Sequence, residues 1–218
     1  MNTIFRNPYQ SELEVAICSR TTVGRQTRIS TDDTILPEYH ALHLAPESVR
    51  VDGKPLSAQA LSQDGTLLVP GSVMKDHLMI QIPFGERMTT LRNVTARLLM
   101  RLTAEQYLHI TPEFAPVPSN LSRFRMQFPG HFSSSDRDPI CSLLQRRVQT
   151  WAQTGINLHS DQDRRETTLF RMATVPWMGP HLFHTAELGS LSIIHAICHA
   201  DALELEVEVL PSPFSEES

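Results

Sequence analysis

Two histidines four residues apart are the first feature of this sequence that points to chemistry. His195 and His199 lie in the stretch "GSLSIIHAICHADALELEVEV". On an α-helix, side chains at this spacing project from one face, as two zinc ligands would. His184 is a candidate third ligand, as are His181, Glu187 and Asp201. Together these residues would form the metal site of a histidine-dependent hydrolase.

The same stretch also fits a helix packed against a core. Thr185 is expected to cap a helix that runs to about Ala200. One stripe of that helix contains apolar residues as well as His195: Leu188, Leu191, Cys198 and Ala202. No glutamate stands where the H-E-x-x-H motif of metalloproteases has its general base. We therefore interpret these histidines as packing residues, and we expect no metal or other cofactor.

A second pair of histidines keeps a hydrolase open as the alternative. His109 and His131 each begin an H-x-[ST] triplet, ending at Thr111 and Ser133. Paired triplets of this kind resemble those of the 2H phosphoesterases, and the resemblance implies an acid–base pair acting on a phosphate ester. In that family the triplets lie in separate halves of a duplicated fold, whereas here mainly a proline-rich stretch separates them.

Charge and composition narrow the classes of partner. The 218 residues carry a net charge of −5, whereas proteins that bind nucleic acid through its phosphates usually have a basic excess. Arg146, Arg147, Arg164 and Arg165 would still form a local basic patch beside Trp151, so nucleic acid stays a possible but not a favoured partner.

Cysteine use and hydropathy indicate the compartment. The three cysteines form no C-x-x-C motif, and an odd number of them suits a reducing compartment. The N-terminal residues lack the pattern of a secretory signal, and no apolar stretch is long enough to cross a bilayer. We expect a cytoplasmic protein that does not bind membranes.

The pattern of elements predicts an α+β fold. Alternating apolar residues and Asp-Gly turns indicate an antiparallel β block, a sandwich or a meander, over roughly residues 10–85. A mixed portion of helices and strands follows. The predicted organisation is a β-rich part (1–110), a proline-rich linker or loop (111–138) and an α+β part (139–218), possibly around one shared core.

Three segments of the second half carry specific predictions. Residues 89–110 fit either a helix or a long strand. A helix is predicted from Asp138, as its N-cap, to Gly155. The segment "LELEVEV" predicts a strand that buries its leucines and valines and exposes Glu204, Glu206 and Glu208.

Apolar residues in predicted loops indicate the most favoured function. Trp177, Met178, Phe183 and Phe128 are large apolar residues of the kind that anchors protein interfaces. Neither a P-loop nor a G-x-S-x-G motif occurs. We therefore expect a non-catalytic, protein-binding or assembly subunit of a larger complex, with other protein subunits as its partners.

Overall fold

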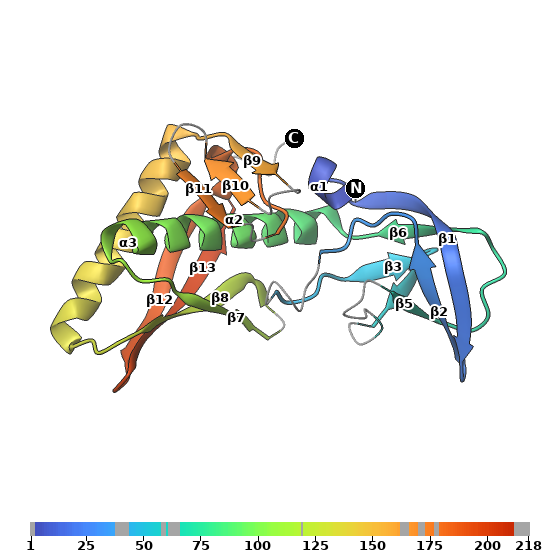
Figure 1. Ribbon diagram of the computed structural model, residues 1–218, viewed down its shortest axis with the longest axis horizontal. Helices are drawn as coiled ribbons and strands as arrows, with labels where there is room; N and C mark the ends of the chain where they lie inside the picture. The colour runs from blue at the N-terminus through green and yellow to red at the C-terminus, as the bar shows by residue number, and fades with distance from the viewer. Residues whose placement is uncertain are drawn as a thin grey trace. The chain divides into compact units, whose positions relative to one another are not determined.

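The chain forms two compact units, Met1–Met88 and Thr89–Ser218. The computed structural model describes residues 3–37, 44–57, 60, 66–118, 120–161, 166–169, 173–176 and 179–211. Long helices and antiparallel sheets confirm the α+β class, with a β-rich N-terminal region (Figure 1).

The N-terminal unit is built on one six-stranded antiparallel sheet, preceded by the short helix α1 (Thr3–Arg6). Its strands are β1 (Glu12–Val23), β2 (Gln26–Thr31), β3 (Val49–Val51), β4 (Lys54–Leu56), β5 (Leu67–Pro70) and β6 (His77–Gln81). Their order is β4-β3-β6-β1-β2-β5, which is not the sequential order of a meander. The long strand β1 joins the two halves, since its first residues pair with β6 and its last with β2.

Local sequence explains this unit well. Val15, Ile29 and Ile80 come from alternating positions of three strands, and each is at most 1% exposed in the shared core. Asp52 and Gly53 connect β3 to β4, and both have positive φ angles (51° and 76°). Asp-Gly is a favoured pair for such tight hairpin turns, so this predicted turn is confirmed.

The ambiguous segment 89–110 lies almost entirely in a helix, α2 (Phe84–Tyr107). From Asn93 to Met100 every residue of α2 is buried. A helix that is surrounded on all sides has no polar face, so its sequence lacks the 3.6-residue periodicity that separates helix from strand.

The segment 111–138, predicted to be a proline-rich linker or loop, contains two strands of the C-terminal sheet. Residues Glu113–Val117 form β7 and Asn120–Pro129 form β8, a central strand of the C-terminal sheet. This four-stranded antiparallel sheet has the order β12-β13-β8-β7. The prolines lie at the edge strand β7 and at the end of β8, where a missing N–H group breaks no internal ladder.

The helix predicted from Thr185 to Ala200 is wrong. A single 3-10 turn, η2 (Thr185–Leu188), is followed by the strand β12 (Ser190–Cys198). β12 pairs with β13 (Ala202–Leu210), which is the predicted "LELEVEV" strand and buries Leu203, Leu205 and Val207 completely. A small sheet of β9 (Leu158–Asp161), β10 (Glu166–Leu169) and β11 (Ala173–Pro176) completes the described strands.

The helix predicted at 138–155 is confirmed, but its start is not. α3 covers Ser134–Thr154, so its N-cap is Ser133 rather than Asp138. The Asp136 carboxylate accepts a hydrogen bond from the Ser133 backbone N–H (2.8 Å). α3 packs against β12 and ends at Gly155, as predicted, in the left-handed conformation (φ 69°).

Replacing Gly155 by alanine is expected to destabilise the fold by about 2 kcal/mol or more, because the left-handed conformation itself costs about 1–2 kcal/mol for a residue with a Cβ. That Cβ would also lie 2.5 Å from Cε1 of His184. Gly24→Ala is the matched control, since Gly24 has a similar φ (61°) and open space around it. Denaturant unfolding of both variants tests the difference, and equal losses would contradict the packing argument.

Candidate protein interface

The three histidines of the predicted metal site have separate roles in the structure. His195 is exposed on β12, His199 follows the strand, and His184 is the N-cap of η2. The Nδ1 atom of His184 accepts a hydrogen bond from the backbone N–H of Ala186 (3.4 Å). Among the residues that the structure describes, no three His, Cys, Asp or Glu side chains gather closely enough to hold a metal ion. The expectation that His195 packs in a core is wrong, because it rested on the helix.

His181 is the buried histidine of this region. Its Nε2 lies 2.6 Å from the Ser160 hydroxyl, and its Nδ1 lies 2.7 Å from the Leu182 carbonyl oxygen. Desolvation lowers the pKa of His181, so the native ring is neutral. The unfolded chain takes up this proton below about pH 6.5, so this group removes stability as the pH falls below that value. Because both ring nitrogens of His181 have hydrogen-bond partners, we assign this histidine a structural role.

Arg97 is a buried cation that the sequence analysis missed. It lies in the middle of α2, is 2% exposed, and has its guanidinium carbon 5.1 Å from the ring centre of Phe124 and 5.7 Å from that of Phe114. Desolvation lowers its pKa to about 9. Nearby, the Asn93 side-chain amide donates to the Leu121 and Arg123 carbonyls, so polar side chains of α2 hold β8 in place.

We expect the difference in free energy of unfolding between the wild type and an Arg97→Met variant to change with pH. Between pH 7.5 and pH 10 it should shift in favour of the wild type by about 1 kcal/mol. The native state loses the Arg97 proton near pH 9, whereas the unfolded chain keeps it to a much higher pH. The unfolded state therefore holds more protons in this window, and stability rises with pH. Parallel denaturation of both proteins measures the difference, and parallel pH profiles would contradict the lowered pKa.

The predicted interface anchors differ in their outcome. Trp177 and Met178 lie outside the described residues. Phe128 is 0% exposed on β8 and packs edge-on against Phe132, so it belongs to the core and cannot anchor a partner. Phe183 is 44% exposed, just before η2. Strand periodicity explains the error at Phe128, since every second residue of β8 faces inward.

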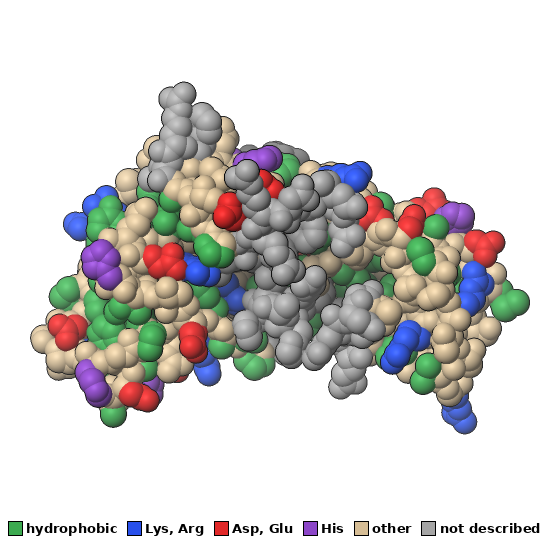
Figure 2. Space-filling view, viewed as in Figure 1, with side chains coloured by type: hydrophobic (Ala, Val, Ile, Leu, Met, Phe, Trp, Pro, Cys, Tyr) green, Lys and Arg blue, Asp and Glu red, His purple; other side chains and the backbone are tan. Residues whose placement is uncertain are grey.

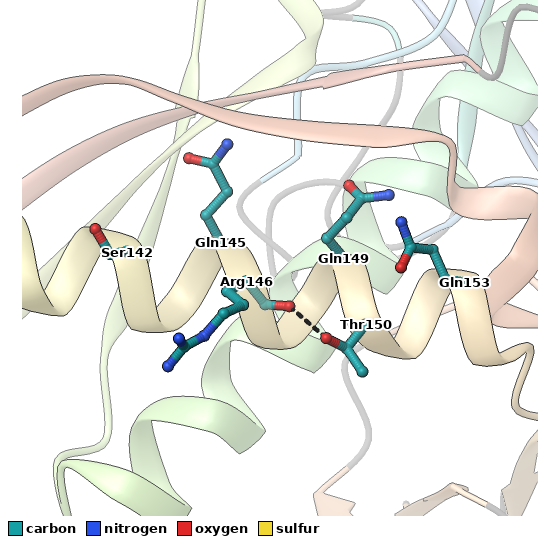
Figure 3. A pocket seen from close by; sticks show the side chains of 6 residues that line it. All are labelled: Ser142, Gln145, Arg146, Gln149, Thr150 and Gln153. Atoms are coloured by element: carbon teal, nitrogen blue, oxygen red, sulfur yellow. Dashed lines mark hydrogen bonds between the residues drawn. The ribbon is translucent and has the colours of Figure 1, made fainter.

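The basic patch predicted beside Trp151 is not assembled on the described surface. Trp151 is buried, and the Arg147 guanidinium lies 4.6 Å from the ring centre of Tyr107. Arg164 and Arg165 are not among the residues described. An open groove of about 540 Å³ runs along this part of α3, lined by Ser142, Gln145, Arg146, Gln149, Thr150 and Gln153. Figure 3 shows the three glutamines projecting to one side of α3. Arg146 is the one charged residue among the six that line the groove, so this helix face is polar but mainly uncharged.

The outer face of the C-terminal sheet is organised in charged rows. Glu204, Glu206 and Glu208 project from β13, and Arg123 and Arg125 project from the neighbouring β8. Arg123 binds Glu208 at 2.8 Å, and Arg125 lies 3.9 Å from both Glu204 and Glu206. The acidic row predicted from the sequence is therefore balanced by β8 on one side. Its other neighbour, β12, has no charged residue apart from the titratable His195.

β12 stands apart from every other strand that ends a described sheet. An edge strand exposes unpaired N–H and C=O groups, and proteins protect such edges by short length, proline, charge, a bulge, or a covering helix or loop. The other five edge strands have at most five residues, and each contains a proline or a charged residue: Pro55 in β4, Pro70 in β5, Glu113 and Pro116 in β7, Asp161 in β9 and Pro176 in β11. β12 has nine residues and contains no proline, Asp, Glu, Lys or Arg, although it carries a bulge at Ile194 and α3 packs against it.

Two of the four exposed residues of β12, Ile194 and Ile197, are large and apolar. Ile194 is 38% exposed and Ile197 is 48% exposed. The pairing with β13 shifts between Ile193 and His195, so Ile194 forms a bulge that leaves a regular four-residue run on either side. In Figure 2, histidine, acidic and hydrophobic side chains lie together at the lower left, where Figure 1 shows the turn of the β12–β13 hairpin. In the part of the chain that the structure describes, no backbone hydrogen bond outside the sheets joins β12 to another element.

Comparisons with known proteins assign no family. No family model matches the sequence, and no curated protein matches it either. No helix within the described ranges is long and apolar enough to cross a membrane. The function therefore has to be argued from the surface of the chain.

Proposed function

We propose that the chain is a protein-binding subunit that joins its partner by strand addition at β12. The observation that carries the proposal is the contrast between β12 and the other edges, which are short and carry proline or charge. A nine-residue edge strand without proline or charge favours pairing with another strand. This contrast supports an assembly role over a metal-dependent hydrolase, for which the described residues supply no group of three ligands.

Strand addition divides affinity and specificity between backbone and side chains. An extended partner segment would form main-chain hydrogen bonds with β12, and these provide affinity for almost any sequence. Ile194 and Ile197 would supply the apolar contacts that select the partner's side chains.

The proposal includes a cytoplasmic location. Cys18, Cys141 and Cys198 are all free thiols, and Cys18 is exposed. Free thiols on a surface persist in a reducing compartment. Mass spectrometry of the chain from its native compartment tests this part, since a disulfide there would contradict it.

Replacing Ile197 by lysine is expected to lower the affinity for the partner by about tenfold or more, since a charge would enter the strand-pairing surface. The fold should keep its melting temperature, because Ile197 is 48% exposed. Val23→Lys is the matched control, as Val23 is 45% exposed on β1. Quantitative affinity purification measures the effect, and equal recovery of partners by both variants would refute the proposal.

Phe183 is proposed as a second contact outside β12. Its side chain is 44% exposed between the buried residues Leu182 and Thr185. Phe183→Ala in the same purification separates the two contacts. If the Phe183→Ala variant loses the partner and the Ile197→Lys variant keeps it, the interface lies at this loop and not at β12.

A further inference from the structure

We infer that the strand added to β12 is β12 of a second copy of the chain, so that two copies pair antiparallel about a two-fold axis. This inference rests on the proposed function and names its partner. A two-fold interface uses the same surface on both subunits, so the surface must fit itself. The fit of β12 to itself can be examined through its register, its faces and its charges.

The faces of β12 match in an antiparallel register centred on the bulge. Ser192 and Ile197 lie opposite glutamates of β13 and face outward, whereas Ile193 and Ala196 lie opposite buried residues and face inward. Pairing Ile193 of one copy with Ala196 of the other also sets Ser192 opposite Ile197. Outward positions then meet outward positions, and inward positions meet inward positions, on both sides of the bulge. The bulge of each copy lies at the two-fold axis, where Ile194 meets His195.

Charge also favours a second copy. β12 contains no acidic residue, lysine or arginine, so two copies place no formal like charges opposite each other. The nearest charged rows are those on β13 of each copy, three strand spacings or about 14 Å apart. That separation exceeds the Debye length of about 8 Å at physiological salt. Each row is also paired with Arg123 and Arg125 of its own copy.

The expected assembly has twice the mass of the 24.6 kDa chain. The four-stranded sheet becomes eight-stranded, within the usual range of sheet sizes. A dimer of the Ile197→Lys variant carries the substitution in both copies. The dissociation constant of the dimer is therefore expected to rise by about tenfold or more. Val23→Lys should leave the mass unchanged. Light scattering after gel filtration, over a micromolar concentration series, measures the mass of all three proteins.

Cysteine pairs test the register separately. With Cys198→Ser as background, a mixture of Ser192→Cys and Ile197→Cys chains is expected to form a disulfide between two copies under mild oxidation. Neither variant alone should form it efficiently, because residue 192 would face 197 rather than itself. A mixture of Ser192→Cys with Val23→Cys is the control. Failure of the 192–197 cross-link with a dimeric protein would overturn this register.

A photo-cross-linker at position 197 separates the inference from the function on which it rests. The purified chain, and the chain in cell extract, would be irradiated and the cross-linked products identified by mass. A product of two identical chains supports the second copy. A product with a different protein overturns the second copy and leaves strand addition standing. Irradiation that yields neither product from a chain with unchanged melting overturns both.

Discussion

Replacing Glu47 by glutamine is expected to lower the free energy of unfolding by about 3–5 kcal/mol. Glu47 Oε2 lies 3.2 Å from Nη2 of Arg87, and both side chains are 0% exposed. The same guanidinium donates to the Ile35 carbonyl (2.6 Å), so the start of α2 is held to two other segments of the N-terminal unit. The substitution leaves the Arg87 charge buried without its carboxylate, and a charge in that state costs far more than the pair contributes.

Two variants separate this explanation from general disturbance. Lys75→Met removes the ion pair between Lys75 and Asp52. Because the Lys75 side chain is 68% exposed, this substitution should lower the free energy of unfolding by less than about 1 kcal/mol. The double variant Glu47→Gln, Arg87→Met removes both charges and should recover much of the loss. Urea unfolding measures all three. A double variant less stable than Glu47→Gln alone would contradict the account.

Replacing Phe128 by alanine is expected to destabilise the C-terminal unit by about 3–5 kcal/mol, because it opens a cavity in the core. Phe128 is 0% exposed on β8, is paired in register with Leu203, and has its ring centre 6.5 Å from that of Phe132. An interface anchor at this position would instead give the opposite result, a loss of binding with normal stability. Thermal unfolding with a binding assay distinguishes the two.

Phe84→Ala is the matched control for this core substitution. Phe84 is 56% exposed at the start of α2, and truncation of such a surface residue usually changes stability by less than about 0.5 kcal/mol. A Phe128→Ala protein that unfolds at the wild-type denaturant concentration would place this side chain outside the core.

Local patterns correctly predicted the antiparallel, β-rich character of the N-terminal region, though not its strand order, and they correctly predicted the strand β13. In both regions apolar and polar residues alternate, and turns are marked by residues that accept positive φ angles, as at Gly53. α3 was found from its buried stripe and from Gly155, while its true N-cap, Ser133, lies five residues before the predicted one, Asp138. The fold class could therefore be read from the sequence.

The errors have a common physical cause. β12 reads "SLSIIHAIC", in which the bulge at Ile194 breaks strict alternation and restores a helix-like spacing of leucine, histidine and cysteine. β7 and β8 lie in a proline-rich segment, but their prolines occupy positions where a sheet tolerates them. In these segments the local sequence favoured no single conformation, so the pairing of strands in the sheet determined it.

The candidate interface was not predictable from the sequence. Its signal is a comparison among the edges of three sheets, and edges exist only once the strand order is known. The predicted anchor Phe183 was chosen for residue type alone, as was Phe128, and burial separates them. Arg97 was missed for a similar reason, since nothing local distinguishes a buried arginine from a solvated one.

Hydrogen exchange of the β12 backbone tests the central claim most directly. Amides of Ser190–Cys198 that do not bond to β13 are expected to become protected as the concentration of the chain rises, or as its partner is added. The edge strand β7 should exchange at a constant rate throughout. Protection of β12 that is lost in Ile197→Lys is the predicted result. Exchange at β12 that never changes with concentration or partner would contradict the account.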